Sequence, residues 1–129
     1  SRGLGDVYKR QGLAVRVIGR FTREKLSIVR EASYIVEDVL KKHGLYSRVW
    51  QAFAVVGDDR WVGVKGDKRF EGYVVIVRIV ESEDAMTADW ARIPYDVLDE
   101  IARRITSRLP VSMVTFSITS KPPSTIEPC

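Results

Sequence analysis

A nearly continuous run of valine and isoleucine occupies residues 73–80 (YVVIVRIV). β-Branched side chains favour strands, and an apolar run without alternation is typical of a strand that is covered on both faces. A subunit contact would bury such a strand equally well. Because the rest of the sequence offers only two helices as cover, we expect a small sheet with apolar surface left for a second copy of the chain.

Two segments have apolar residues at helical spacing. The first begins after Thr22, a suitable N-cap, carries Glu24 in its first turn and ends near His43. The second begins at Pro94, has acidic residues early and arginines late, and is stopped by Pro110. The apolar stripes of these two helices are formed by Leu26, Val29, Val36, Val39 and Leu40 and by Val97, Leu98, Ile101 and Ile105.

The remaining strand candidates are residues 14–18, 49–56, 60–65 and 113–119, with turns at 57–59 and 66–69 and a loop at 82–93. The first turn predicts a hairpin between 49–56 and 60–65. In the last strand, Val114, Phe116 and Ile118 fall on one face. Since hairpins imply antiparallel pairing, we predict an α+β fold, with a small, mostly antiparallel sheet and two main helices packed on it.

Composition excludes several classes of protein. A length of 129 residues fits one domain, and no apolar run reaches the length of a membrane span, so we expect no membrane contact. The single cysteine, Cys129, and the single histidine, His43, exclude a disulfide framework and argue against a zinc site. His43 is better explained as a polar residue at a helix end. This cysteine usage fits a reducing compartment, and we expect a cytoplasmic protein.

The first eleven residues, SRGLGDVYKRQ, differ in character from the rest of the chain. They lack an initiator methionine, resemble a translated sequencing adapter, and contribute three basic side chains and one acidic side chain to a net charge of only +4. We therefore expect residues 1–11 to be a non-native segment and residues 12–129 to be one domain.

Five residues are candidate ligand contacts. Asp67 and Arg69 share a tight turn, where arginine can bind a phosphate and aspartate a sugar or base, although solvated turns often contain such residues. Gln51 lies in the apolar strand VWQAFAVV, where its amide needs a partner from the sheet or from a ligand. Lys121 and Glu127 flank a proline pair that would stiffen the end of the chain and lower the entropic cost of binding, the alternative being a disordered end.

Two further function classes find little support in the residues. No glycine-rich phosphate loop is present, and no general acid, general base, nucleophile or metal ligand can be assigned. Nucleic-acid binding is not expected, because Arg103, Arg104 and Arg108 are explained by a helix end and no aromatic residues interleave with a basic stripe.

Several stretches together resemble one family. GLAVRVIG, TREKLSIVREA, VWQAFAVV, VGVKGDKRF, the segment from GYVVIVRIV through MTADWARIPYDVL to EIARRI, and TSKPPSTIE occur in that order. They resemble the C-terminal domain of GMP synthase, glutamine-hydrolysing type, from about residue 12 to residue 127. MTADWARIPYDVL and ITSKPPSTIE are the most specific of these blocks.

The resemblance implies a domain of a ligase. In that family the domain follows an ATP-pyrophosphatase domain, forms a homodimer and completes the nucleotide site. The whole enzyme activates xanthosine monophosphate (XMP) with ATP and magnesium, and ammonia from a glutamine amidotransferase domain or subunit then gives GMP. The present chain lacks the upstream SGGVDS-type ATP loop, so we expect it to be inactive alone and to bind neither ATP nor magnesium itself.

The resemblance also assigns the five candidates to XMP. Lys121 matches a lysine on the phosphate, Glu127 a glutamate on the nucleotide, and Gln51 a strand glutamine; Asp67 and Arg69 match the family's GD-x-R turn. The chain departs from the family at its end, where IEPC replaces the usual IEWE. The alternative function is a free-standing dimerisation or nucleotide-binding module without a catalytic partner.

Overall fold

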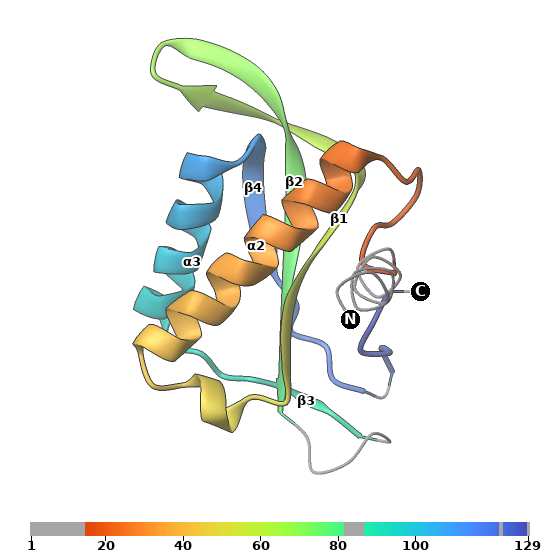
Figure 1. The fold of residues 1–129 in the computed structure, drawn as a ribbon, viewed down its shortest axis with the longest axis vertical. Coiled ribbons are helices and arrows are strands. Elements are labelled where there is room, and N and C mark those ends of the chain that lie inside the picture. Colours follow the sequence, from red (N-terminus) through yellow and green to blue (C-terminus); the bar gives the residue numbers. More distant parts are fainter. Residues whose placement is uncertain (1–14, 82–86, 122, 129) are drawn as a thin grey trace, which may run out of the picture.

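The fold was analysed in a computed structural model that describes residues 15–81, 87–121 and 123–128. Its elements are α2 (Arg23–Lys42), the short 3-10 helix η1 (Tyr46–Arg48), β1 (Gln51–Lys65), β2 (Lys68–Glu81), β3 (Asp89–Trp90), α3 (Tyr95–Arg108) and β4 (Val111–Phe116) (Figure 1). The segment 1–11, expected to be non-native, lies outside the described residues. The predicted α+β class is confirmed.

The sheet is built around β2. Strands β1 and β3 pair with β2 antiparallel, whereas β4 pairs with it in parallel. A parallel neighbour requires a crossover connection, and α3 lies in that connection between β2 and β4. The sheet is therefore mostly antiparallel, as predicted, but its last strand enters through a helical crossover and not through a hairpin.

Both helices follow the sequence pattern. The Thr22 hydroxyl accepts from the backbone N–H of Lys25 at 3.1 Å, which caps the start of α2. After the C-cap at His43, Gly44 has φ +70°, the left-handed conformation that glycine adopts readily. Most stripe residues are buried, with Leu26 and Leu98 only partly so. Helix α3 ends at Arg108, before Pro110.

The predicted turn at residues 57–59 is wrong. Strand β1 continues through it as a bulge, with a register shift between Val56 and Arg60. Asp58 accounts for the difference, because its carboxylate accepts from the backbone N–H of Arg20 at 3.1 Å and pairs with the ammonium of the buried Lys25. The acidic residue thus ties the bulge to the start of α2 and does not reverse the chain.

Three smaller expectations are also corrected. In place of a strand at 14–18, the described part of that segment forms a single parallel bridge between Val17 and Val56. The expected loop at 82–93 contains the two-residue strand β3 in its described part. Ile118 does not continue the face of Val114 and Phe116; it lies beyond the end of β4 and is 64% exposed.

The β1–β2 hairpin has two distinct halves. Beyond the bulge it projects past the helices, and we call this part, residues 60–72, the arm (Figure 1). Before the bulge, the sheet is covered by helices on one face and by residues 117–121 and 123–128, which we call the tail, on the other. Residues 73–80 are buried except for Val74 and Ile76, so the interpretation as a strand covered on both faces is confirmed. The apolar surface expected here for a second copy of the chain is not found, because the tail covers the face that the helices leave free.

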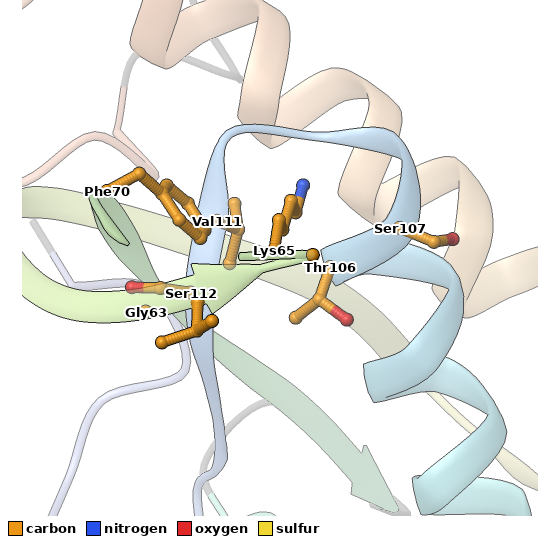
Figure 2. A pocket seen from close by; sticks show the side chains of 9 residues that line it. Gly63, Lys65, Phe70, Thr106, Ser107, Val111 and Ser112 are labelled. Atoms are coloured by element: carbon orange, nitrogen blue, oxygen red, sulfur yellow. The ribbon is translucent and has the colours of Figure 1, made fainter. Parts of the chain in front are cut away.

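Two glycines allow β4 to approach the base of the arm. A Cβ atom on Gly72 would meet the backbone nitrogen of Ser112 at 2.6 Å, and one on Gly63 would meet the Ser112 Cβ at 2.8 Å. The approach leaves a cavity of about 460 Å³ between the arm, the start of β4 and the end of α3 (Figure 2). It is lined by Gly63, Val64, Lys65, Gly66, Phe70, Thr106, Ser107, Val111 and Ser112.

Candidate functional site

The tail lies against the face of the sheet opposite the helices, held by a buried arginine. Arg78 in β2 is only 5% exposed and donates to oxygens at both ends of the tail. Its acceptors are the Ser117 hydroxyl at 2.8 Å and the carbonyls of Thr119 at 2.5 Å, Thr125 at 3.2 Å and Ile126 at 3.3 Å. Burial lowers the pKa of the guanidinium from its usual value, yet an arginine keeps its charge at neutral pH.

Glu127, one of the predicted site residues, is held by a second arginine. Arg16 donates through Nε and Nη2 to the two carboxylate oxygens of Glu127, each at 3.2 Å. The Arg16 guanidinium also lies 4.2 Å from the centroid of the Phe53 ring. A bidentate pair stacked on an aromatic ring fixes both charge and direction, so the Glu127 carboxylate has a defined place on the sheet face.

Lys121 is positioned by Ala88, the residue that precedes strand β3. Its backbone exchanges two hydrogen bonds with Ala88, at 2.7 and 3.1 Å. The neighbouring Ser120 hydroxyl donates to the Asp89 carboxylate at 2.5 Å, and this bond, together with Arg92, holds the pKa of Asp89 below its usual value. Pro122 lies outside the described residues, so the bracing role predicted for the proline pair remains a prediction.

Gln51 opens β1 opposite Val80 in the register of the sheet. Its side-chain oxygen Oε1 is buried and has no hydrogen-bond partner among the described residues. Alternation along β1 places Gln51 on the same face as Phe53, and so on the tail side. An unsatisfied buried acceptor is costly, on the order of 1–3 kcal/mol, which a donor from a ligand would recover.

Asp67 and Arg69 lie elsewhere. Asp67 is in the two-residue turn of the arm after Gly66, which has φ +62°, and Arg69 pairs with Val64 just beyond. Both side chains are exposed. Strand β1 has 15 residues, and at a rise of about 3.3 Å per residue it extends over roughly 46 Å from end to end. The structure therefore brings Gln51, Lys121 and Glu127 to one half of the sheet and does not bring Asp67 and Arg69 to them.

A smaller cavity lies beneath the tail. It measures about 270 Å³, and its lining combines apolar strand residues with polar groups of the tail. The residues around it include Val55, Ile76, Arg78, Ser117, Thr125 and Glu127. Of the three candidate residues on this side of the sheet, Glu127 lines this cavity, whereas Gln51 and Lys121 do not.

Comparison with known proteins agrees with the motifs in the sequence. Residues 38–128 match the family model described as GMP synthase C terminal domain. The chain belongs to this family. Similar proteins named GMP synthase [glutamine-hydrolyzing] include those of Pyrobaculum aerophilum, 70% identical over 119 residues, Thermotoga petrophila, 59% over 117 residues, and Dehalococcoides mccartyi, 55% over 117 residues.

These alignments cover 92%, 90% and 90% of the present chain but only 24%, 23% and 22% of the three relatives. The chain thus spans about a quarter of the length of the curated relatives it matches. GMP synthases are ligases, so this GMP synthase C-terminal domain corresponds to one part of a ligase.

Two residues that organise the domain were missed by sequence reasoning. Arg78 stands inside the apolar run YVVIVRIV, and a lone charge in a buried strand is itself a signal that polar partners must be near. Arg16 lies in a segment read only as a short strand, and its partner is 111 residues away. No local pattern could have indicated that contact.

Other chemistry is limited in the described part of the domain. His43 Nε2 lies 2.9 Å from Glu100, linking the end of α2 to α3, in line with its predicted place at a helix end. No group of three or more His, Cys, Asp or Glu residues is arranged to hold a metal among the described residues. None of the helices in the described segments is long and apolar enough to cross a bilayer.

Proposed function

We propose that this chain is the XMP-binding and dimerisation part of a glutamine-hydrolysing GMP synthase. The whole enzyme would convert XMP to GMP with ATP and with ammonia released from glutamine. Membership of the family and the relatives' names support this assignment. The motifs GVKGDKRF and SKPPSTIE, by which the chain resembles the family, carry the proposed ligand contacts.

The observation that carries the proposal is that three candidate residues lie in the tail or on the sheet face that the tail covers. Lys121 would bind the phosphate as a point charge, and Glu127 would accept from the ribose or base. Gln51 supplies a buried amide oxygen that lacks a partner among the described residues, and the N–H groups of a xanthine ring are suitable donors. Ordering of the tail by Arg78 and Arg16 lowers the entropic cost of binding.

The separation of Asp67 and Arg69 supports a site shared between two subunits. One chain cannot place the tip of its arm beside its own tail, because the tip and the tail lie at opposite ends of the β1–β2 strand pair. A second copy could present its arm there. The arm also exposes Trp61, Val62 and Val64, the kind of apolar surface that a homodimer contact covers.

Catalysis itself is assigned to other parts of the enzyme. In this proposal, the pyrophosphatase domain would bind ATP and magnesium, and the amidotransferase domain or subunit would supply ammonia, as the family resemblance implies. ATP would supply an adenylyl group that activates XMP for attack by ammonia. The present residues would bind and orient XMP in the cytoplasm, with no direct contact to nucleic acid or membrane.

The test uses a full-length enzyme in which this chain replaces the matching segment of the Pyrobaculum aerophilum relative. Lys121→Ala should raise the KM for XMP at least about tenfold, the loss of one charge-assisted hydrogen bond, with the KM for ATP unchanged. Lys41→Ala, an exposed lysine on α2, is the matched control. An unchanged KM for XMP in Lys121→Ala would refute the proposed site.

A further inference from the structure

Arg78 is a buried charged residue that is not among the proposed XMP contacts. It is a charged residue, 5% exposed, in a strand otherwise made of valine, isoleucine and tyrosine at residues 73–80. In the described structure it forms no ion pair with a carboxylate; its acceptors are all uncharged oxygens of the tail. A buried charge without a counter-ion costs stability, so its presence calls for a role that an apolar residue could not fill.

We propose that Arg78 is a positioning residue of the nucleotide site, which fixes the path of the tail and thereby the placement of Lys121 and Glu127. This inference rests on the proposed function, because it gives Arg78 its effect through the two proposed XMP contacts. It adds a residue that would not touch the nucleotide itself.

The hydrogen bonds of Arg78 bracket the segment that carries Lys121. Two acceptors, Ser117 and Thr119, precede Lys121 in the chain, and the other two, Thr125 and Ile126, immediately precede Glu127. One planar group therefore holds together the two stretches of the tail, the one that ends at Lys121 and the one that leads to Glu127. If either pair of bonds were lost, the segments that carry Lys121 and Glu127 would be held only by the Ala88 bridge and by the Arg16 pair, and their positions would be less firmly fixed.

Arginine is suited to this task in a way that lysine is not. Its guanidinium directs five N–H donors from a rigid plane, whereas a lysine ammonium offers three donors from one point. The four acceptors are distributed over Nε, Nη1 and Nη2 of the Arg78 guanidinium, so no single nitrogen could reach all of them. Three of these acceptors are backbone carbonyls, and the hold on the tail is therefore largely independent of tail side chains.

Arg16 and Arg78 hold different parts of the tail. Arg16 binds the Glu127 carboxylate itself, whereas Arg78 contacts only the backbone beside it and the start of the tail. Loss of Arg16 should release one side chain. Loss of Arg78 should release both stretches of the tail that it holds, including the one around Lys121.

The experiment compares Arg78→Lys and Arg78→Met with Lys121→Ala in the same full-length chimaeric enzyme. Hydrogen exchange without nucleotide would follow the amides of Lys121 and Ser124, which donate to Ala88 and Ser120. Steady-state kinetics would give KM for XMP, KM for ATP and kcat. Ile105→Val, a buried change in α3, controls for a general loss of stability.

We expect both Arg78 variants to exchange these tail amides faster, with Arg78→Met the more severe, and to raise the KM for XMP about tenfold, the equivalent of one lost charged hydrogen bond. The KM for ATP should stay unchanged, because a positioning role acts on one substrate only. Ile105→Val should move neither the tail amides nor the KM for XMP. The use of two substitutions keeps the test decisive if Arg78→Met fails to fold.

Two outcomes would overturn the inference. One is an unchanged KM for XMP in Arg78→Lys while Lys121→Ala raises it, since the tail would then work without Arg78. The other is a change of similar size in the KM for XMP, the KM for ATP and kcat, which would make Arg78 merely structural. If Lys121→Ala itself leaves the KM for XMP unchanged, it is the proposed function that fails, and faster tail exchange in Arg78→Met would still show that Arg78 holds the tail.

Discussion

The tail and the arm both carry proposed XMP contacts, yet they are held in opposite ways. The tail is bound to its own chain by Arg78 and by the bidentate Arg16–Glu127 pair. The arm projects beyond the helices and exposes apolar side chains (Figure 1). Near its tip, Lys65 Nζ donates to the Leu109 carbonyl of the body at 3.2 Å. One half of the proposed site is thus pre-organised within the chain, whereas in the proposal a second copy of the chain would present the other half.

The largest expected effect concerns the partner of the arm. Val64 is 67% exposed, so Val64→Glu should leave the monomer folded but place a charge in the proposed dimer contact. We expect the dissociation constant of the dimer to rise roughly 30-fold or more, as for loss of a hot-spot residue worth 2 kcal/mol. Sedimentation velocity would measure it. Tyr95→Glu, at an 89% exposed site on α3, is the control and should leave the dimer intact. If both variants weakened the dimer equally, the arm would not be the dimer contact.

A subunit-mixing experiment sharpens the comparison next. Arg69→Ala and Lys121→Ala full-length enzymes should each bind XMP weakly, since each removes one half of every site. In a mixed population about half of the dimers are heterodimers with one intact site each, so about a quarter of wild-type sites should return. Recovered activity at low XMP concentration measures this. No recovery after subunit exchange would mean that arm and tail do not serve one site across the dimer.

The base of the arm packs closely against the start of β4, so we expect little room for a larger side chain there. Gly72→Ala would press a methyl group against the Ser112 backbone at 2.6 Å, and backbone cannot move aside cheaply. We expect a loss of about 1–3 kcal/mol in the free energy of unfolding. Gly57→Ala is the control in the same strand pair, because its Cβ would find ordinary contacts at 3.7 Å. If urea titration gave both variants the same stability, the close approach of β4 would be disproved.

The smallest effect expected is a pH dependence confined to the base of the arm. A hydrogen bond from Lys25, then one from the Arg20 backbone, lowers the pKa of Asp58 from its usual 3.8. A depressed folded-state pKa means that the stabilisation is present above about 3.8 and is lost as the pH falls through the lower folded value. Amide exchange in the arm should therefore accelerate below that pH before exchange in the tail does.

Asp58→Asn serves as the control for this pH effect. It should exchange arm amides faster already at neutral pH and should lose the acid step. Glu100 belongs to a different contact, between α2 and α3, and His43 and Lys42 lower its pKa to about 2. Glu100→Gln should therefore leave the arm step in place. An acid step that survives in Asp58→Asn would assign it to another group.

The helices and the central strand could be predicted from the sequence because their signals are local. The Thr22 cap, the glycine after His43 and the apolar stripes act over a few residues, and each holds in the structure. The bulge could not be predicted, because the composition of residues 57–59 fits a turn and only the contact of Asp58 with Lys25, 33 residues earlier, decides otherwise.

The candidate site was predictable to a similar degree. Family motifs indicated all five residues, but not that the chain would separate Asp67 and Arg69 from the rest. That separation follows from the length of β1, which runs through the predicted turn without reversing. Arg16 and Arg78 were missed because their partners lie in the tail, 111 and 39 to 48 residues away.

The contacts of Arg78 also have a consequence for synthesis on the ribosome. Its acceptor Ile126 lies 48 residues later, so at about 5–20 residues per second the guanidinium waits several seconds for its last partner. During that interval the sheet face around residues 73–80 is uncovered. A charge in the middle of a valine-rich strand discourages pairing with the strands of neighbouring nascent chains. The residue that later holds the tail would therefore also act as a gatekeeper against aggregation while the chain is being made.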